Sequence, residues 1–347
     1  MTQTISISVQ SATELSVSAF VSTGMSVDDA AASVWPLIEA EMMGITTHGL
    51  IRVPIYAQRL RLGGINPRAT VSTERRAPAL ALIDGGNASG TLVATRALDI
   101  GLEIVAETGI AYAGCRYSNH CGALIPYGLK ASDAGYVLLA GTNASTSMAP
   151  WGGSEVRMGN NPFCMAAPIG DSPHFLLDMA MSVAARGKIR AARSAGQTIP
   201  TGWAVDNQGR PTNDPVAALE GFLAPMGGHK GSGMSQAIDI LSAVLNGAKF
   251  LTGIPSWMEN PEISSELGHF FILIDPARLI GRDAYNQAME HFRNIILETP
   301  AADPAESVRL PGQAEQERRA NSIRDGLTVP ADLIEEIRTL GNGTTST

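Results

Sequence analysis

The most informative stretch of this sequence is Gly227-Gly228-His229-Lys230-Gly231-Ser232-Gly233. Glycines flank a single lysine, and apolar residues then recur at helical spacing as far as Gly247. This pattern predicts a glycine-rich turn that leads into a helix, with a cation beside the helix N-terminus. Backbone amides and the positive end of a helix suit an anion there, usually a phosphate. An ordinary loop before a helix would leave the same pattern, so both interpretations stay open.

The same stretch is the nearest approach in the chain to the dinucleotide-binding pattern G-x-G-x-x-G. Gln236 stands where the third glycine belongs. The standard Rossmann fingerprint is therefore absent. If a dinucleotide binds, another geometry must hold it.

Strands and helices are predicted to alternate along the chain, which would ordinarily favour a parallel, doubly wound sheet. The missing fingerprint argues against the usual version of that fold. Three stretches rich in Gly, Pro or charge are predicted as linkers: 61–76, 196–215 and 299–321. The strands are predicted over 4–9, 80–83, 110–115, 136–141, 163–167, 175–179 and 270–274, and the helices over 26–43 (with Pro36 as a kink or as the true start), 89–107, 123–134, 183–193, 232–246, 282–297 and 331–340.

Composition excludes several classes of protein. The 347 residues are enough for two or three domains, and the net charge of -8 argues against nucleic acid as a partner. No stretch approaches the roughly 18 apolar residues of a membrane span, and no Lys or Arg precedes Arg52 to form a secretory signal. Cys115, Cys121 and Cys164 have neither zinc-site nor disulfide-framework spacing. We therefore expect no metal site, no membrane partner and a cytoplasmic location.

A first candidate for chemistry is the run that contains Thr47, His48, Arg52 and Tyr56. If this run is helical, the last three side chains share one face because they are four residues apart. A histidine can exchange a proton, and an arginine fork fits a carboxylate, so this face suits a small organic acid. A solvated polar helix face is the alternative.

A second candidate is Ser118-Asn119-His120-Cys121-Gly122, which follows a predicted strand. Loops at strand ends often carry function, and His120 could exchange a proton near neutral pH. Cys121 invites a nucleophile interpretation with His120 as its base. Neighbours in sequence seldom face each other productively, so packing is the favoured role for this thiol.

Polar and glycine-rich residues also end two other predicted strands. Thr142, Asn143 and Ser145 follow one strand, and Asp178 closes another. Such ends can present amides and hydroxyls to a ligand, although they equally well form tight turns. Asp178 could bind a ribose hydroxyl or cap the helix that follows.

Taken in order, these segments resemble the malate/L-lactate dehydrogenase type 2 family of NAD(P)-dependent oxidoreductases, which do not have the Rossmann fold. The resemblance runs from about residue 42 to 312. It is carried by Thr47-His48-Gly49, Ser118-Asn119-His120, Ala149-Pro150-Trp151-Gly152-Gly153, Asn161-Pro162, Leu177-Asp178-Met179-Ala180, Ala185-Arg186-Gly187-Lys188, Gly202-Trp203-Ala204, Gly227-Gly228-His229-Lys230-Gly231 and Gly268-His269-Phe270-Phe271.

The resemblance implies an α+β fold with a mixed, largely antiparallel sheet flanked by helices, and a homodimer. It implies three regions: residues 1–75 with 312–347 as a helical terminal region, 76–122 with 268–311 on the substrate and dimer side, and 123–267 as the NAD(P)-binding domain. The implied reaction is a reversible hydride transfer between NAD or NADP and a small 2-oxo or 2-hydroxy acid, such as malate, lactate, sulfolactate or a ureidoglycolate-like acid.

The resemblance also implies roles for single residues. His48 and His120 become the acid–base candidates and Arg52 the carboxylate clamp, with Thr47, Tyr56 and Asn119 at the substrate. The implied cofactor contacts are Thr142, Asn143, Ser145, Asp178, Met179, Ala180, His229, Lys230, Gly231, Arg309, Pro311 and Gly312.

Several alternatives stay open. The same family resemblance accommodates a cyclic imino acid (ketimine) reductase, such as a piperideine- or pyrroline-2-carboxylate reductase. A non-catalytic nucleotide-binding protein and a hydrolase that uses Cys121 are more distant. The sequence ranks neither NAD against NADP nor His48 against His120 as proton donor. Ser232 stands where an aromatic residue is frequent in relatives, so cofactor packing is expected to differ there.

Overall fold

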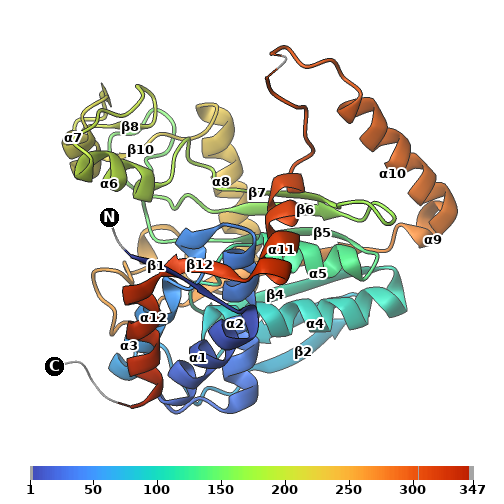
Figure 1. The fold of residues 1–347 in the computed structure, drawn as a ribbon, viewed down its shortest axis with the longest axis horizontal. Coiled ribbons are helices and arrows are strands. Elements are labelled where there is room, and N and C mark those ends of the chain that lie inside the picture. The colour runs from blue at the N-terminus through green and yellow to red at the C-terminus, as the bar shows by residue number, and fades with distance from the viewer. Residues whose placement is uncertain (1–2, 304, 344–347) are drawn as a thin grey trace.

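The computed structural model describes residues 3–303 and 305–343. Its centre is a seven-stranded sheet, whose strands run roughly horizontally in Figure 1. Five of the six strand pairings are antiparallel, and only β3 and β4 are parallel, joined by the crossover helix α4. In spatial order the strands are β2 (Ser72–Ala77), β3 (Leu80–Asp84), β4 (Ile110–Ser118), β11 (Leu267–Ile274), β5 (Val137–Thr142), β6 (Phe163–Ala167) and β7 (Phe175–Met179).

The middle strand β11 divides the interior into two cores, because successive side chains of a strand point to opposite faces. Phe271 and Leu273 belong to the larger core, whereas Phe270 belongs to the smaller one and Ile272 packs against it. Each face therefore needs its own helical cover, and a chain with helices on only one side would leave half of β11 in water.

Two helical layers provide this cover. On the larger core lie α4 (Gly90–Thr108) and α5 (Ile125–Asp133), backed by helices from both ends of the chain; α8 (His229–Ser242) packs on the other face. The backing helices are α1 (Val9–Val21), α2 (Val27–Met42), α3 (Arg52–Leu62), α11 (Gln313–Asp325) and α12 (Ala331–Gly341). Short 3-10 turns are η1 (Thr46–His48), η2 (Val244–Asn246) and η3 (Leu251–Gly253).

A small lobe covers the end of the sheet near α8. It contains a three-stranded sheet in the order β10-β8-β9 and two short helices (Figure 1, upper left). Its elements are α6 (Arg186–Ser194), β8 (Ala204–Val205), β9 (Pro211–Thr212), α7 (Pro215–Glu220) and β10 (Phe222–Leu223). The chain ends meet elsewhere, where β1 (Thr4–Ile7) pairs with β12 (Leu327–Pro330).

One segment leaves the body of the molecule. The short helix α9 (Ala277–Ile280) and the long helix α10 (Arg282–Leu297) form an arm that stands apart from the rest in Figure 1. No residue of α10 is buried. We call α9 and α10 the arm below.

The predicted α+β class with a largely antiparallel sheet is confirmed, and the parallel doubly wound alternative is wrong. The three predicted linkers are partly wrong: β2 (Ser72–Ala77) overlaps 61–76, β8 and β9 lie within 196–215, and α11 begins at Gln313 within 299–321. Strand β2 and helix α11 lack a buried residue, so neither has the apolar periodicity that a sequence can reveal. Helix α1 was not predicted, and α2 runs through Pro36 from Val27.

The predicted region boundaries remain a prediction, and part of the C-terminal one (344–347) lies outside the described residues. Within residues 3–303 and 305–343, no helix is both long and apolar enough to cross a bilayer.

Candidate active site

The first candidate run does not form one helix. His48 ends the 3-10 turn η1, Gly49 leaves helical geometry with φ −94° and ψ −137°, and Arg52 then begins α3. Arg52 and Tyr56 are one turn apart on α3, as the spacing predicts. The Nε of Arg52 donates to the Thr47 carbonyl at 2.7 Å, so the arginine closes the loop that carries His48.

A buried carboxylate holds this loop from the other side. Oε2 of Glu41, on α2, accepts the backbone N–H of Leu50 at 2.8 Å. Burial raises the pKa of Glu41, and the Leu50 amide acts in the opposite direction. A β-carbon at Gly49 would lie 2.0 Å from the same oxygen, so only glycine fits beside Glu41. No local pattern in the sequence indicates this contact.

The fold brings His48 and His120 together although 72 positions separate them in the sequence. Their rings stack with centroids 5.5 Å apart and an interplanar angle of 24°. Each ring meets a hydroxyl at Nδ1: Thr47 Oγ1 lies 2.9 Å from His48, and Tyr56 Oη lies 2.5 Å from His120. Neither Nε2 has a hydrogen-bond partner among the described residues, so both are free to meet a ligand.

The tautomer of His120 follows from its neighbours. The backbone N–H of Gly122 points at Nδ1 over 3.3 Å, and an amide can only donate. Nδ1 is therefore an acceptor in this state, Tyr56 donates its O–H to it, and the ring proton sits on Nε2. A hydroxyl can also accept, so the Tyr56 contact can persist when His120 gains a proton at Nδ1.

Both imidazoles are neutral at physiological pH. Burial and the positive charge of Arg52 lower the pKa of His48 to about 4. The pKa of His120 is held well below its usual range by burial first, and then by Arg52 and three other cationic or imidazole neighbours. No carboxylate contributes to either shift, so the site is poised for an anion.

Two site residues were missed by sequence reasoning. Trp257 lies in the loop after η3, with its ring 5.3 Å from the His120 ring and between two guanidinium groups, those of Arg52 at 5.6 Å and Arg59 at 5.8 Å. Arg59 is 1% exposed and fixes this loop by donating to the carbonyls of Ile263 and Pro261. About 200 residues separate these partners, and no local pattern could have indicated the contact.

Behind His120, a third imidazole links two strands. His269 on β11 is fully buried, with Nδ1 2.7 Å from Thr142 Oγ1 and Nε2 2.7 Å from Ser118 Oγ. Burial lowers its pKa to about 3, so it bridges the two hydroxyls as a neutral ring. His269 therefore ties the strand that leads to His120 to the strand that ends at Thr142.

The two asparagines predicted at the site are buried and engaged with protein groups. The amide of Asn119 donates to Asn87 Oδ1 at 2.9 Å and to the Ala88 carbonyl at 2.8 Å. Asn143 donates to Asp239 Oδ1 and accepts the Gly268 N–H at 3.0 Å. Both amides brace the ends of β4 and β5. Ser145 is only half-buried.

Asp178 does not cap the helix that follows it, which was one of the two roles weighed for it; it caps the earlier helix α5 instead. Its Oδ2 accepts the N–H groups of Leu124 and Ile125 at 2.8 and 2.9 Å, at the start of α5. Burial raises its pKa to about 6, against the effect of these two amides. Met179 and Ala180, which follow it, are half-buried.

The glycine-rich turn leads into a helix as predicted, but α8 begins at His229, before the predicted start at residue 232. Its amides are largely used within the turn: the N–H groups of Lys230, Gly231 and Ser232 each meet a backbone carbonyl. An anion here would rely on the exposed Lys230 side chain and on the dipole of α8. Ser232 Oγ accepts the Trp151 N–H at 3.0 Å, so serine at this position fixes the Trp151 loop.

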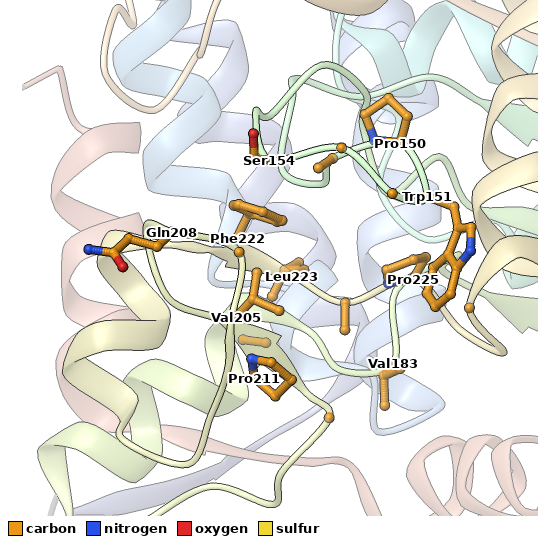
Figure 2. Close-up of a pocket in the computed structure, with 18 of the residues that line it drawn as sticks. Pro150, Trp151, Ser154, Val183, Val205, Gln208, Pro211, Phe222, Leu223 and Pro225 are labelled. Atoms are coloured by element: carbon orange, nitrogen blue, oxygen red, sulfur yellow. The ribbon is translucent and has the colours of Figure 1, made fainter.

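A cavity of about 760 Å³ lies next to this turn. Figure 2 shows Trp151 and Pro225 at one end of it, with Phe222 and Gln208 at the other. Gly228, with φ +66°, lies against the Trp151 ring, where a β-carbon would meet the indole at 3.1 Å. The cavity is of a size that small-molecule and cofactor sites have, and its apolar walls fit the base and ribose of a nucleotide.

The remaining candidates lie near β7 or in the core. The Pro311 carbonyl accepts the Leu176 N–H at 3.0 Å, Gly312 packs on Leu176, and Arg309 is exposed and paired with Glu317. Cys121 is 1% exposed, and burial raises the pKa of its thiol to about 12. That thiol has no thiolate character, which fits the packing role and not the hydrolase alternative.

Several enzymes are similar to this chain in sequence. L-sulfolactate dehydrogenase of Methanocaldococcus jannaschii is 34% identical over 319 residues, covering 92% of this chain and 91% of that protein. (2R)-3-sulfolactate dehydrogenase (NADP(+)) of Chromohalobacter salexigens is 31% identical and covers 96% and 97%. Ureidoglycolate dehydrogenase (NAD(+)) of Escherichia coli is 31% identical and covers 90% and 89%.

Solved structures of similar enzymes have a similar fold to this chain. Sulfolactate dehydrogenase from M. jannaschii matches with a TM-score of 0.90 and 31% identity over 97% of each chain. A delta1-piperideine-2-carboxylate reductase from Pseudomonas syringae matches with a TM-score of 0.88 and 28% identity over 97% of this chain and 99% of that one. The family described as malate/L-lactate dehydrogenase matches residues 7–338. The predicted recognition is confirmed, and this chain belongs to the malate/L-lactate dehydrogenase family of NAD- or NADP-dependent oxidoreductases.

Proposed function

We propose that this protein reversibly transfers a hydride between NAD(P)H and a small 2-oxo acid, with the 2-hydroxy acid as the reduced product. The observation that carries the proposal is the pair of neutral imidazoles beside Arg52, with no carboxylate contributing to the shifts of either ring. Two relatives are named for sulfolactate and ureidoglycolate, which are small 2-hydroxy acids, and this supports the proposed substrate class.

The roles of the residues follow from their charge and position. Arg52 binds the substrate carboxylate, since a guanidinium fork matches it. The bound anion offsets the positive charge that lowers the pKa of His120, so that ring gains a proton as the substrate binds. His120 then gives the Nε2 proton to the substrate oxygen, and in the reverse direction the neutral ring takes it back.

His48 orients the substrate and Thr47 holds its ring, because both lie on the more open side of the pair. Trp257 closes the site against water, which strengthens the charge interactions inside it. Asn119 and His269 act behind His120 by fixing the strand that carries it.

The Trp151 cavity and the turn at Lys230 would hold the cofactor, which supplies the hydride when bound. Thr142, Asn143 and Asp178, at the ends of β5 and β7, remain candidates for contacts with that cofactor. We also propose a cytoplasmic homodimer, because the three cysteines are free and buried, and because no residue of helix α10 in the arm is buried.

The test is a steady-state assay of NADH and NADPH oxidation with pyruvate, oxaloacetate, sulfopyruvate and a cyclic imino acid. Replacement of His120 by Gln (H120Q) should lower kcat by about a hundredfold or more, the usual size of acid–base catalysis. H48Q should chiefly raise KM. His291→Gln, on the exposed arm, is the matched control and should leave kcat unchanged.

Turnover of the imino acid alone would favour the reductase alternative. The similarity to the piperideine-2-carboxylate reductase supports that alternative. No turnover with any acid or imine would refute the proposed function.

A further inference from the structure

The small lobe carries a basic hollow that the proposed reaction does not use. Arg186, Arg190 and Arg193 are spaced at i, i+4 and i+7 on α6, so they share one face of the helix. With Ser194 and Leu219 they line a hollow of 380 Å³. Only Ile189 of α6 is buried, so the helix packs through a narrow apolar contact and presents its arginines outward.

These charges are not balanced by protein carboxylates. Among the described residues, none of the three arginines forms an ion pair. Arg186 also sits in the first turn of α6, which has no acidic residue, so its charge opposes the helix dipole. A cluster that is unfavourable on its own, in a chain of net charge -8, indicates an anion that binds it.

The geometry of the cluster is partly fixed in advance. Arg186 is half-buried and donates from Nη2 to the Leu219 carbonyl at 2.6 Å. Burial and the neighbouring charge of Arg190 lower its pKa, and Glu259 acts more weakly in the opposite direction. Arg190 and Arg193 keep their donors free, and the Ser194 hydroxyl lies beside them. Guanidinium forks of this kind fit the oxygens of a phosphate.

The hollow and the Trp151 cavity are lined by nearby residues of the same two segments. Val183 lines the cavity and Arg186, three residues later, lines the hollow; Leu219 lines the hollow and Phe222, three residues on, lines the cavity. The same two segments therefore contribute to an apolar chamber and to a basic one. A ligand with an aromatic base, a ribose and a phosphate on that ribose would match the two together.

We propose that the α6 hollow binds a phosphate monoester on the ribose of the nucleotide, and that the enzyme therefore prefers NADP to NAD. This inference rests on the proposed function for the placement of the cofactor in the Trp151 cavity. It concerns binding, so it can fail or hold independently of the acid that is reduced.

The experiment is isothermal titration calorimetry of the full chain with 2′,5′-ADP and with 5′-AMP, which differ only in the 2′-phosphate. The wild type should bind 2′,5′-ADP more tightly, by about tenfold or more for each charge-assisted contact. Arg190→Ala and Arg193→Ala should each remove most of that advantage and leave 5′-AMP binding unchanged. Arg190→Lys should restore part of it, and Arg338→Ala, on α12, is the matched control.

Three other results would contradict the proposal. Equal affinity of the wild type for both nucleotides overturns the proposal. Equal losses for both nucleotides in the variants would place the 5′-phosphate in the hollow and overturn it as well. A rise in KM for the acid alone would assign the hollow to the substrate and not the cofactor. Arg193→Glu, at an exposed position, keeps the test decisive if an alanine variant folds poorly.

Discussion

Arg59 is the residue on which the active-site loop most depends. It is almost fully buried, lacks a carboxylate partner, and binds the carbonyls of Gly64, Pro261 and Ile263. Burial lowers its pKa to about 10, which still leaves it charged at neutral pH. The guanidinium group is thus needed for its shape, because only a side chain with several N–H donors in a fork can bind three carbonyls at once.

We expect Arg59→Met to lower the free energy of unfolding by about 3 kcal/mol, since each buried carbonyl left unpaired costs about 1–3 kcal/mol. KM for the acid should rise as Trp257 loses its place beside His120. Thermal unfolding and steady-state kinetics measure the two effects. Arg61→Met, on the same helix but exposed, is the control. Equal effects of both substitutions would contradict the positioning role.

The buried imidazoles make stability depend on pH. In the folded state the pKa is about 4 for His48 and about 3 for His269, both below the value near 6.5 of an unfolded chain. Below pH 6.5 the unfolded state therefore binds more protons, and stability falls as the pH falls. Asp178, whose pKa is raised to about 6, partly offsets this because its folded form takes the proton first.

The expected slope is up to about 1.4 kcal/mol per pH unit for each such histidine. Urea unfolding at pH 7, 6 and 5 should show the decline, and His269→Gln should reduce the slope whatever its effect at pH 7. A slope that is the same in the variant and the wild type would show that His269 does not stay neutral in the folded chain.

Residue types with an obvious chemistry could be predicted from sequence, and their supports could not. The charges and spacing of Arg52 and Tyr56 indicate a shared helix face, and the structure has it. Trp257 and Glu41 act through contacts with distant or irregular segments, which leave no periodic signal. Whether each predicted residue binds its ligand stays a prediction.

At the scale of elements, the break between η1 and α3 decides where His48 points. Gly49 is the break, and the carboxylate of Glu41 occupies the space that any side chain there would need. In a continuous helix, His48 would lie on the same face as Arg52 and Tyr56. The interruption instead turns it onto His120.

Gly49→Ala should therefore displace the loop and lower kcat/KM by about tenfold or more, because a shift of about 1 Å can cost a hundredfold. Gly253→Ala is the control, since nothing lies within 4 Å of a β-carbon there. If Gly49→Ala kept full activity, the Glu41 contact would be unimportant for the site.

The elements that could be predicted were those with a clear apolar periodicity of their own. Helix α10 was predicted with its observed bounds because its own apolar pattern is strong, although it buries nothing within the chain. Strand β2 and helix α11 have no buried residue and were read as linkers. An element held only by its neighbours leaves little trace in the order of its residues.

At the scale of the whole molecule, the sheet order is what sequence reasoning could not supply. Strand β11, from the last third of the chain, lies between β4 and β5, and so brings His269 between Ser118 and Thr142. Local patterns give strands but not their pairing. The family resemblance supplied the antiparallel class, which the residues alone had not.

The arm is the feature that a single chain does not explain. A helix of 16 residues with no buried side chain is marginal in water, since most helical stability comes from packing. Four large apolar side chains of the arm are exposed: Leu279 (74%), Ile280 (59%), Phe292 (46%) and Ile295 (56%). Such a patch on a projecting element is typical of a subunit interface.

We therefore expect the arm to pack on a second copy of the chain. Phe292→Ser with Ile295→Ser should shift the protein from dimer to monomer in sedimentation velocity, and should lower Tm at low protein concentration because dimer stability follows mass action. Leu62→Ser removes an equally exposed apolar side chain from α3 and should leave the dimer intact. A wild-type protein that sediments as a monomer at micromolar concentration would show that the arm needs another partner.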